Sequence, residues 1–130
     1  LGLGGGAVVL FELRLSGIEE LRGNCRPVLR PASAFPASLR DISMLAPADR
    51  TQDEAASDIR AAARAAAGWD ILDELRLFDV YEGKGIPEGF RSLAFSLSYR
   101  APDRTLNDEE VERVHGMVRD TLVQKGYNMR

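Results

Sequence analysis

Residues 77–100, LFDVYEGKGIPEGFRSLAFSLSYR, read as two β-strands on either side of a loop that contains glycine and proline. Successive side chains of a strand point to opposite faces of the sheet. Asp79 and Tyr81 are therefore predicted to share one face of the first strand, and Phe78 and Val80 to share the other. An acidic and an aromatic side chain together beside this loop indicate a flat, polar surface.

The second strand of the pair alternates regularly between large and small side chains. Its large side chains are Leu93, Phe95, Leu97 and Tyr99, and its small ones are Ser92, Ala94, Ser96 and Ser98. Alternation with a period of two is typical of a strand that has one buried and one solvated face. If the large set faces helices, the small set forms a shallow outer platform on which a planar group can lie.

The sequence before these strands predicts a further strand and a helix. Residues 40–45, RDISML, read as the strand. Thr51 and Glu54 have the spacing of a capping box, and Gly68 is a natural residue to end a helix. The alanine-rich segment between them favours a helix that packs closely on the core.

The sequence after the two strands repeats this pattern. Asn107 and Glu110 again have capping-box spacing, Gly126 ends the second predicted helix, and residues 127–130 form a short last strand or tail. From residue 40 the order is strand, helix, strand, strand, helix, strand, which is the order of a ferredoxin-like split βαβ fold. We therefore predict an α+β domain whose antiparallel sheet carries two helices on one face and leaves the other face open.

The composition is that of an ordinary globular chain and excludes several classes of protein. The chain has 130 residues, 45% of them hydrophobic, and a formal net charge of −3, so it is not a broadly basic nucleic-acid coat protein. Cys25 is the only cysteine and His115 the only histidine, which excludes an intrachain disulfide and a Cys/His zinc site. The sequence contains no apolar run that spans a bilayer and no signal peptide, and a reducing, cytoplasmic setting is predicted.

Three stretches carry a resemblance to a known family. They are FPASLRDISMLAP (35–47), LFDVYEGKGIPEGFRSLAFSLSYRAPDRTLNDEEV (77–111) and KGYNMR (125–130). Together they resemble the C-terminal anticodon-binding domain of the bacterial phenylalanyl-tRNA synthetase beta subunit, over roughly residues 34–130. The long central block is far more specific than any short motif.

The resemblance implies a role in tRNA binding and no catalysis on this chain. The family enzyme is an (αβ)₂ assembly that attaches phenylalanine to its tRNA with ATP and magnesium, and its alpha subunit holds the aminoacylation site. The implied partners are the anticodon loop of tRNA(Phe) and that alpha subunit. The fragment itself is expected to hold no cofactor and to carry no catalytic residue.

The resemblance also predicts how the chain is divided. GGGAVVLFELRL is similar to the end of the catalytic-like domain that precedes the anticodon module in that subunit. We therefore predict a remnant of that domain at 1–24, a proline-rich connector at 25–36 and the ferredoxin-fold domain at 37–130. Because the chain begins at Leu1, we expect it to be a fragment of a longer protein.

The resemblance also implies a role for Asp79 and Tyr81 in binding RNA. Unpaired RNA bases are read by stacking on aromatic rings and by hydrogen bonds to their edges. Tyr81 would stack on an anticodon base, and Asp79 would accept hydrogen bonds from a guanine edge. Both match the anticodon-contacting tyrosine and aspartate of the family pattern, in FDVY. The small residues Ser92, Ala94 and Ser96 would form the platform beneath the base.

Residues near the strand ends complete the predicted site. Tyr127 is predicted to supply a second ring. The predicted phosphate contacts are basic side chains: Arg40, Lys84, Arg91, Lys125 and Arg130.

Other interpretations stay open on the residues alone. Tyr81 suits a solvated strand end, and Asp79 suits the cap of the following turn. A ferredoxin-like fold is equally compatible with a regulatory or protein-interaction module without RNA binding. An acylphosphatase-like hydrolase would need an anion-binding loop, and LAPADRTQ offers Arg50 but no glycine-rich nest.

Overall fold

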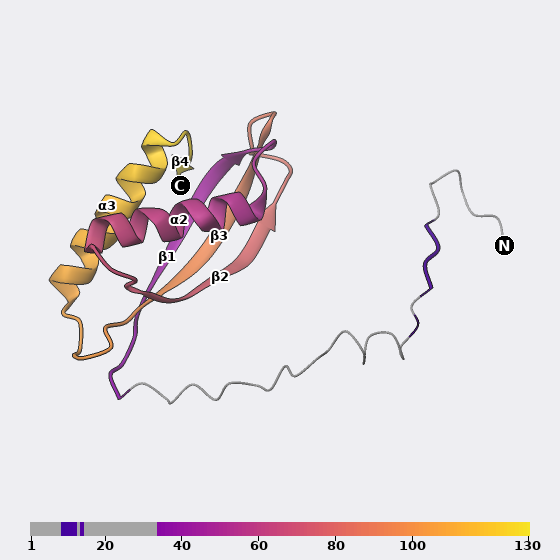
Figure 1. The fold of residues 1–130 in the computed structure, drawn as a ribbon. Coiled ribbons are helices and arrows are strands. Elements are labelled where there is room, and N and C mark those ends of the chain that lie inside the picture. Colours follow the sequence, from indigo (N-terminus) through magenta and orange to yellow (C-terminus); the bar gives the residue numbers. More distant parts are fainter. Residues whose placement is uncertain (1–8, 13, 15–33) are drawn as a thin grey trace. The chain divides into compact units, whose positions relative to one another are not determined.

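Two helices lie against one face of a four-stranded antiparallel sheet (Figure 1). The structure is a computed structural model that describes residues 9–12, 14 and 34–130. Its elements are β1 Ser38–Pro47, α2 Gln52–Ala67, β2 Leu72–Tyr81, β3 Phe90–Tyr99, α3 Asp108–Gln124 and β4 Asn128–Met129. The sheet order is β2-β3-β1-β4, so β1 and β3 lie at its centre. The predicted ferredoxin-like architecture is confirmed.

The predicted division of the chain lies largely outside the described residues. Residues 33–130 form one compact unit. Residues 9–12 and 14 are in neither helix nor strand. The assignment of 1–24 to a preceding domain and of 25–36 to a connector therefore stays a prediction.

The first helix begins and ends where its sequence predicts. The Thr51 hydroxyl accepts a hydrogen bond from the Glu54 amide (3.2 Å), and the Glu54 carboxylate accepts one from the Thr51 amide (2.7 Å). This reciprocal pair satisfies two amides that the helix cannot satisfy itself. Gly68 ends α2 with a φ of 80°, in the left-handed region that glycine adopts without strain.

The second helix has only half of the predicted capping box. The Asn107 side chain accepts from the Glu110 amide at 2.7 Å, as predicted. The Glu110 carboxylate instead accepts two hydrogen bonds of 2.7 Å from the Arg104 guanidinium. The bidentate pair therefore ties the loop before α3 to its first turn.

The helix-facing side of the sheet forms the core. The large β3 side chains are each at most 1% exposed: Leu93, Phe95, Leu97 and Tyr99. The buried residues of α2 are Ala55, Ile59, Ala62 and Ala63, and those of α3 are Val111, Val114, Val118, Leu122 and His115. The alanines of α2 allow its backbone to approach the sheet closely. From Ser92 to Tyr99, the large side chains of β3 thus lie on one face and the small ones on the other.

One polar pair is enclosed in this core. The Tyr99 hydroxyl lies 3.0 Å from His115 Nδ1, and the two rings meet edge to face with centroids 6.0 Å apart. Burial lowers the pKa of His115 and raises that of Tyr99. His115, the only histidine of the chain, is therefore a buried structural residue.

Candidate nucleic-acid interface

The strand register gathers the predicted platform residues on the open face. Asp79 pairs with Ala94, and Tyr81 pairs with Ser92. Directly paired residues of antiparallel strands point to the same face. These four side chains therefore lie opposite the core face that Leu93 defines. The structure brings them together as the sequence predicts.

Tyr81 lies over the β2–β3 turn. The residue is 45% exposed, and its hydroxyl donates to the backbone oxygen of Lys84 at 3.3 Å. A Cβ atom at Gly83 would lie only 2.9 Å from the Tyr81 hydroxyl oxygen. The glycine therefore makes room for the ring, which explains why an aromatic residue is followed by EGKG. The ring is held in place and still offers a face to solvent.

Asp79 and Lys84 supply opposite charges beside this ring. Both residues are exposed. Across residues 34–130, the Asp79 carboxylate makes no hydrogen bond and no ion pair, so its oxygens are available as acceptors. Lys84 lies in the turn on which the Tyr81 ring rests. An acceptor, a ring and a cation at one strand end match the needs of an unpaired nucleotide, which presents donors, a π-face and a phosphate.

Two predicted phosphate contacts lie on the wrong face. Arg40 pairs with Leu97 and Arg91 pairs with Ala46, and both partners are buried on the helix side. The Arg40 Nε atom lies 2.6 Å from a carboxylate oxygen of Glu112 on α3. The prediction that Arg40 and Arg91 contact phosphates beside the platform is therefore wrong, because strand alternation turns both away from it.

Arg91 has a structural role on the helix side. One of its terminal nitrogens donates to the backbone oxygen of Arg50, and the other lies 3.9 Å from the Glu82 carboxylate. Its side chain is only 17% exposed. Arg91 thus connects the turn before α2 with the residue that follows Tyr81.

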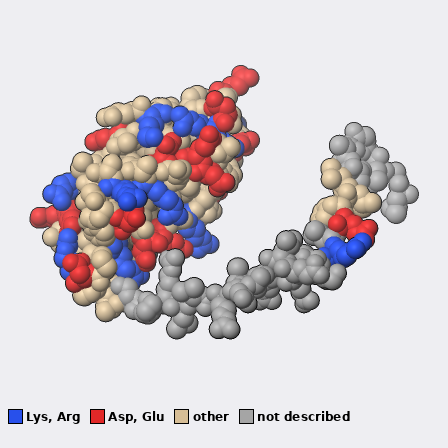
Figure 2. All heavy atoms as spheres, in the orientation of Figure 1, with Lys and Arg blue, Asp and Glu red and all other residues tan. Residues whose placement is uncertain are grey.

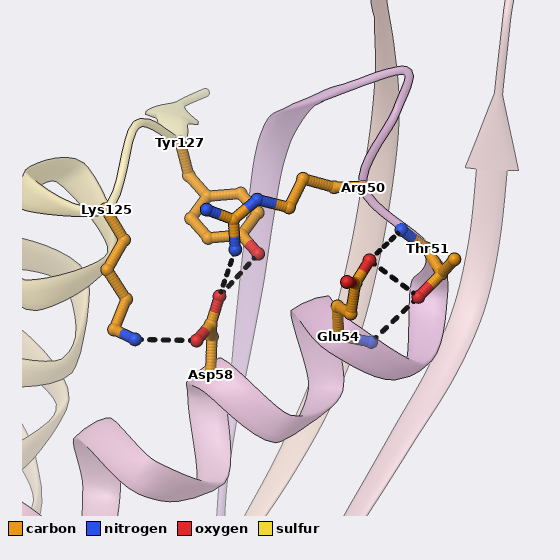
Figure 3. Close-up of polar contacts among 6 residues, drawn as sticks. All are labelled: Arg50, Thr51, Glu54, Asp58, Lys125 and Tyr127. Atoms are coloured by element: carbon orange, nitrogen blue, oxygen red, sulfur yellow. Dashed lines mark hydrogen bonds and ion pairs between the residues drawn. The ribbon is translucent and has the colours of Figure 1, made fainter.

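Tyr127 does not provide a second stacking ring. It is 1% exposed, and its hydroxyl donates to Asp58 at 2.8 Å (Figure 3). The Arg50 guanidinium lies 5.9 Å from the ring centre, and Lys125 donates to the other Asp58 oxygen at 2.7 Å. The predicted roles of Tyr127 in stacking and Lys125 in phosphate contact are therefore wrong. Both residues instead fix the C-terminal segment to α2.

The protonation of this cluster follows from its contacts. Burial by itself would raise the pKa of Asp58, but the hydrogen bonds from Lys125 and Tyr127 outweigh it and the net pKa is lowered. Burial, together with the bond to Asp58, raises the pKa of Tyr127 to about 12. The carboxylate is thus charged and the phenol neutral at neutral pH, as the hydrogen bond requires.

Arg130 follows the short strand β4 beside β1. Its backbone amide donates to the Ser43 backbone oxygen at 2.9 Å. Met129 pairs with the buried Met44, so the alternation of a strand places Arg130 on the side of the open face. Arg130 and Lys84 are the predicted phosphate contacts that the fold leaves available.

Phe78 lies on the open face, contrary to the sequence prediction. The β2–β3 register shifts between Leu77 and Asp79, so Phe78 is an extra residue without a partner. Such a bulge interrupts alternation, and Phe78 lines a hollow together with Ser96. The residue is 53% exposed. Val80, in contrast, pairs with the buried Leu93 and lies on the helix side as predicted.

The surface carries charges of both signs. Figure 2 shows basic and acidic side chains interspersed on the side that bears the helices. Among the described residues, no cluster of His, Cys, Asp or Glu is arranged to hold a metal ion. No helix in that part of the chain is long and apolar enough to cross a bilayer.

Comparisons with known proteins identify the family of this domain. Residues 33–130 match the model of the ferredoxin-fold anticodon binding domain. The chain is 48% identical to the phenylalanine–tRNA ligase beta subunit of Symbiobacterium thermophilum over 125 residues, which are 96% of this chain and 13% of that protein. The beta subunit from Trichormus variabilis is 48% identical over 105 residues, which are 80% of this chain and 12% of that protein.

The match covers a small part of these relatives. The chain spans about one eighth of the length of the curated beta subunits that it matches. The matched family model covers the whole sheet and both helices, from before β1 to the last residue. The resemblance seen in the sequence is thereby confirmed, and the chain belongs to the ferredoxin-fold anticodon-binding domain family.

Proposed function

We propose that the open sheet face binds the unpaired bases of the anticodon loop of tRNA(Phe), as part of a phenylalanine–tRNA ligase beta subunit. The observation that carries the proposal is the exposed ring of Tyr81 beside the unpaired Asp79 carboxylate on that face. Family membership and the identity of the relatives as phenylalanine–tRNA ligase beta subunits support the choice of RNA and of tRNA(Phe).

Tyr81 and Asp79 have different tasks in this proposal. The Tyr81 ring stacks on one anticodon base, an interaction worth about 1–3 kcal/mol per base. Asp79 accepts hydrogen bonds from the base edge, and guanine presents two adjacent N–H donors there. Ser92 and Ala94 are small enough to let the base lie flat, and Lys84 and Arg130 contact phosphates.

The aminoacylation reaction itself belongs to the intact ligase in this proposal. We assign ATP, magnesium and the joining of phenylalanine to tRNA to the complete enzyme with its alpha subunit, in the cytoplasm. No catalytic step is assigned to this chain. Its contribution is to select the correct tRNA by its anticodon.

The test is titration of a tRNA(Phe) anticodon stem-loop with the 130-residue chain. Tyr81→Ala should weaken binding by about 5- to 150-fold, which corresponds to the loss of one stack. Asp79→Ala should remove the preference for guanine over adenine at the first anticodon base. Val123→Ala is a matched control, because Val123 is a 52% exposed apolar residue on α3.

The outcomes distinguish anticodon binding from a protein-interaction module without RNA binding. Weaker binding by Tyr81→Ala with unchanged binding by the control supports anticodon recognition. If the native chain does not bind the stem-loop, the substitutions are repeated in the full-length ligase and tRNA aminoacylation is measured. Unchanged kcat/KM for tRNA in both variants would contradict the proposal and favour a protein-interaction module.

A further inference from the structure

Arg91 lies beside the strand end that carries Tyr81, but on the opposite face of the sheet. Its neighbour Ser92 pairs with Tyr81, and strand alternation turns the Arg91 side chain to the helix side. One terminal nitrogen of the guanidinium donates to the backbone oxygen of Arg50, and the other lies 3.9 Å from the Glu82 carboxylate. Arg91 therefore joins the residue directly after Tyr81 to the turn between β1 and α2.

The Arg50 end of this link is held by α2 and by the C-terminal segment. The Arg50 guanidinium donates to Asp58 at 3.1 Å and lies 5.9 Å from the centre of the Tyr127 ring (Figure 3). The Arg50 backbone amide also donates to the Pro47 oxygen at 3.0 Å. Because both its side chain and its backbone are fixed, the Arg50 carbonyl oxygen is a firm acceptor for Arg91.

The β2–β3 loop, residues 82–89, is anchored to this turn at both of its ends. At the far end, the Ala48 amide donates to the Gly89 oxygen at 2.8 Å. At the near end, Glu82 reaches the turn through Arg91. Loss of Arg91 would therefore release the near end of the loop while the far end stays attached.

The Tyr81 ring takes its position from this loop. Its hydroxyl donates to the Lys84 backbone oxygen at 3.3 Å, and its hydroxyl oxygen lies 2.9 Å from where a Cβ atom of Gly83 would be. Both contacts are made with the loop and not with the core. A shift of the loop would therefore tilt the ring, and a stack on a planar base depends on the plane of the ring.

Stability alone does not account for an arginine at this position. The Arg91 Nε atom is buried and has no hydrogen-bond partner among the described residues, and a buried donor without a partner costs free energy. The ion pair with Glu82 is long, and the Glu82 side chain is 66% exposed, so the pair contributes little to stability. What the forked guanidinium does supply is a bridge between two anchors.

We propose that Arg91 is a positioning residue of the RNA site, which fixes the loop beneath Tyr81 and so sets the plane of the ring that stacks on a base. The inference rests on the proposed function, because the plane of the ring matters only if the ring binds a base. Arg91 acts from the helix side and does not touch the RNA. Its loss weakens RNA binding only through Tyr81.

The central experiment compares Arg91→Gln with Arg100→Gln in titrations of the 130-residue chain with the anticodon stem-loop. Arg100 is a matched control, because its guanidinium also bridges a carboxylate and a backbone oxygen, those of Asp73 at 2.9 Å and Phe35 at 2.7 Å. It lies about 30 Å along the strand from Arg91. Arg91→Gln should bind several-fold more weakly, and Arg100→Gln should bind like the native chain. Unchanged circular dichroism in both variants shows that the fold is intact.

A double-mutant cycle tests whether Arg91 acts through Tyr81. In the Tyr81→Ala background, Arg91→Gln should change the affinity by no more than about twofold, because the ring that it positions is gone. An equal loss in both backgrounds would overturn the proposal, because it would show a contribution that is independent of the ring.

The salt dependence separates positioning from a direct phosphate contact. Arg91→Gln should bind more weakly by the same factor at every salt concentration, so the slope of log affinity against log salt should equal that of the native chain. A slope smaller by about 0.7 would mean that Arg91 contacts a phosphate, and would overturn the proposal.

Glu82→Ala tests the same link from its exposed end, and it serves if Arg91→Gln does not fold. On charge alone, removing a carboxylate beside the site should strengthen RNA binding. Positioning predicts the opposite, weaker binding, because the loop loses its near anchor. Unchanged or tighter binding by Glu82→Ala would contradict the proposed link.

Failure of this inference can be told from failure of the proposed function. If Tyr81→Ala weakens binding but Arg91→Gln binds like Arg100→Gln, the positioning role is wrong and anticodon binding stands. If the native chain does not bind the stem-loop, the same variants are compared in the full-length ligase by kcat/KM for tRNA. If Tyr81→Ala has no effect there either, the proposed function fails and this inference fails with it.

Discussion

The two faces of β3 differ in side-chain size more than in any other property. On the helix side, Phe95 and Leu97 are at most 1% exposed. On the other side, the same strand presents Ser92 and Ala94 next to the partly exposed Tyr81. One face is filled by the protein's own core, and the other carries small side chains from Ser92 to Ser98. One strand thus contributes to the core on one side and to the proposed RNA-binding face on the other.

The charged residues follow the same division. On the helix side, Arg40 and Asp58 have ion-pair partners at 2.6 Å and 2.7 Å. On the open face, Asp79 and Arg76 have no ion-pair partner among residues 34–130. Satisfied charges hold elements together, whereas unsatisfied ones are available to a ligand.

The largest expected effect is on stability. Phe95→Ala empties a buried site on the helix side and should lower the free energy of unfolding by about 3–5 kcal/mol. Ser96→Ala, its neighbour on the open face, should change it by less than about 0.5 kcal/mol. Urea denaturation measures both. Similar losses in the two variants would contradict the division between the faces.

The next prediction alters the platform without touching the core. Ala94→Leu adds a bulky side chain between Asp79 and the middle of the sheet, where it should obstruct a base. We expect about tenfold weaker binding of the stem-loop, or about 1.4 kcal/mol. The free energy of unfolding should stay within about 0.5 kcal/mol. Native affinity in this variant would mean that RNA does not lie on the platform.

A smaller effect separates the two kinds of basic residue. Lys84→Ala should reduce the slope of log affinity against log salt by about 0.7, the value of one phosphate contact with a single strand. Arg40→Ala should leave this slope unchanged, because Arg40 pairs with Glu112 on the helix side. Titrations from low to moderate salt measure both slopes. A reduced slope in Arg40→Ala would contradict its assignment.

The pH dependence of stability should reveal the buried pair in the core. Burial lowers the pKa of His115 from its ordinary value of 6.5. The unfolded chain therefore binds a proton before the folded chain does, and stability should fall as pH drops below about 6.5 toward the folded-state pKa. His115→Gln should remove this fall.

The contribution of Asp58 to stability should be lost separately, at more acidic pH, because the pKa of its carboxyl group is lowered below the ordinary value of 3.8.

Local patterns in the sequence were sufficient to predict the element order, the caps of α2 and the two faces of β3. The caps depend on residues within one or two turns of the helix, and the faces of β3 depend on the strict alternation of side chains along a strand. The faces of Arg40 and Arg91 also follow from that alternation, because Arg40 shares a face with Ile42 and Arg91 shares one with Leu93. The ion-pair partner of Arg40, Glu112, lies 72 residues away and could not be predicted in this way.

The environments of Tyr127 and Phe78 could not be predicted from such local patterns. Tyr127 is buried, and Asp58, 69 residues earlier, accepts a hydrogen bond from its hydroxyl. Phe78 changes face because the register shift between Leu77 and Asp79 leaves it without a partner on β3. Neither the long-range contact nor the bulge has a local sequence signal. In both cases tertiary pairing decides what a ring can contact.

The most direct test of the account compares two alanine methyl groups by NMR during titration with the anticodon stem-loop. Ala94 lies on the open face beside Asp79, and Ala46 is fully buried on the helix side. We predict a large shift of the Ala94 methyl signal and little change at Ala46. Binding that leaves Ala94 unchanged and instead shifts signals of α2 and α3 would contradict the claim that the open sheet face reads RNA.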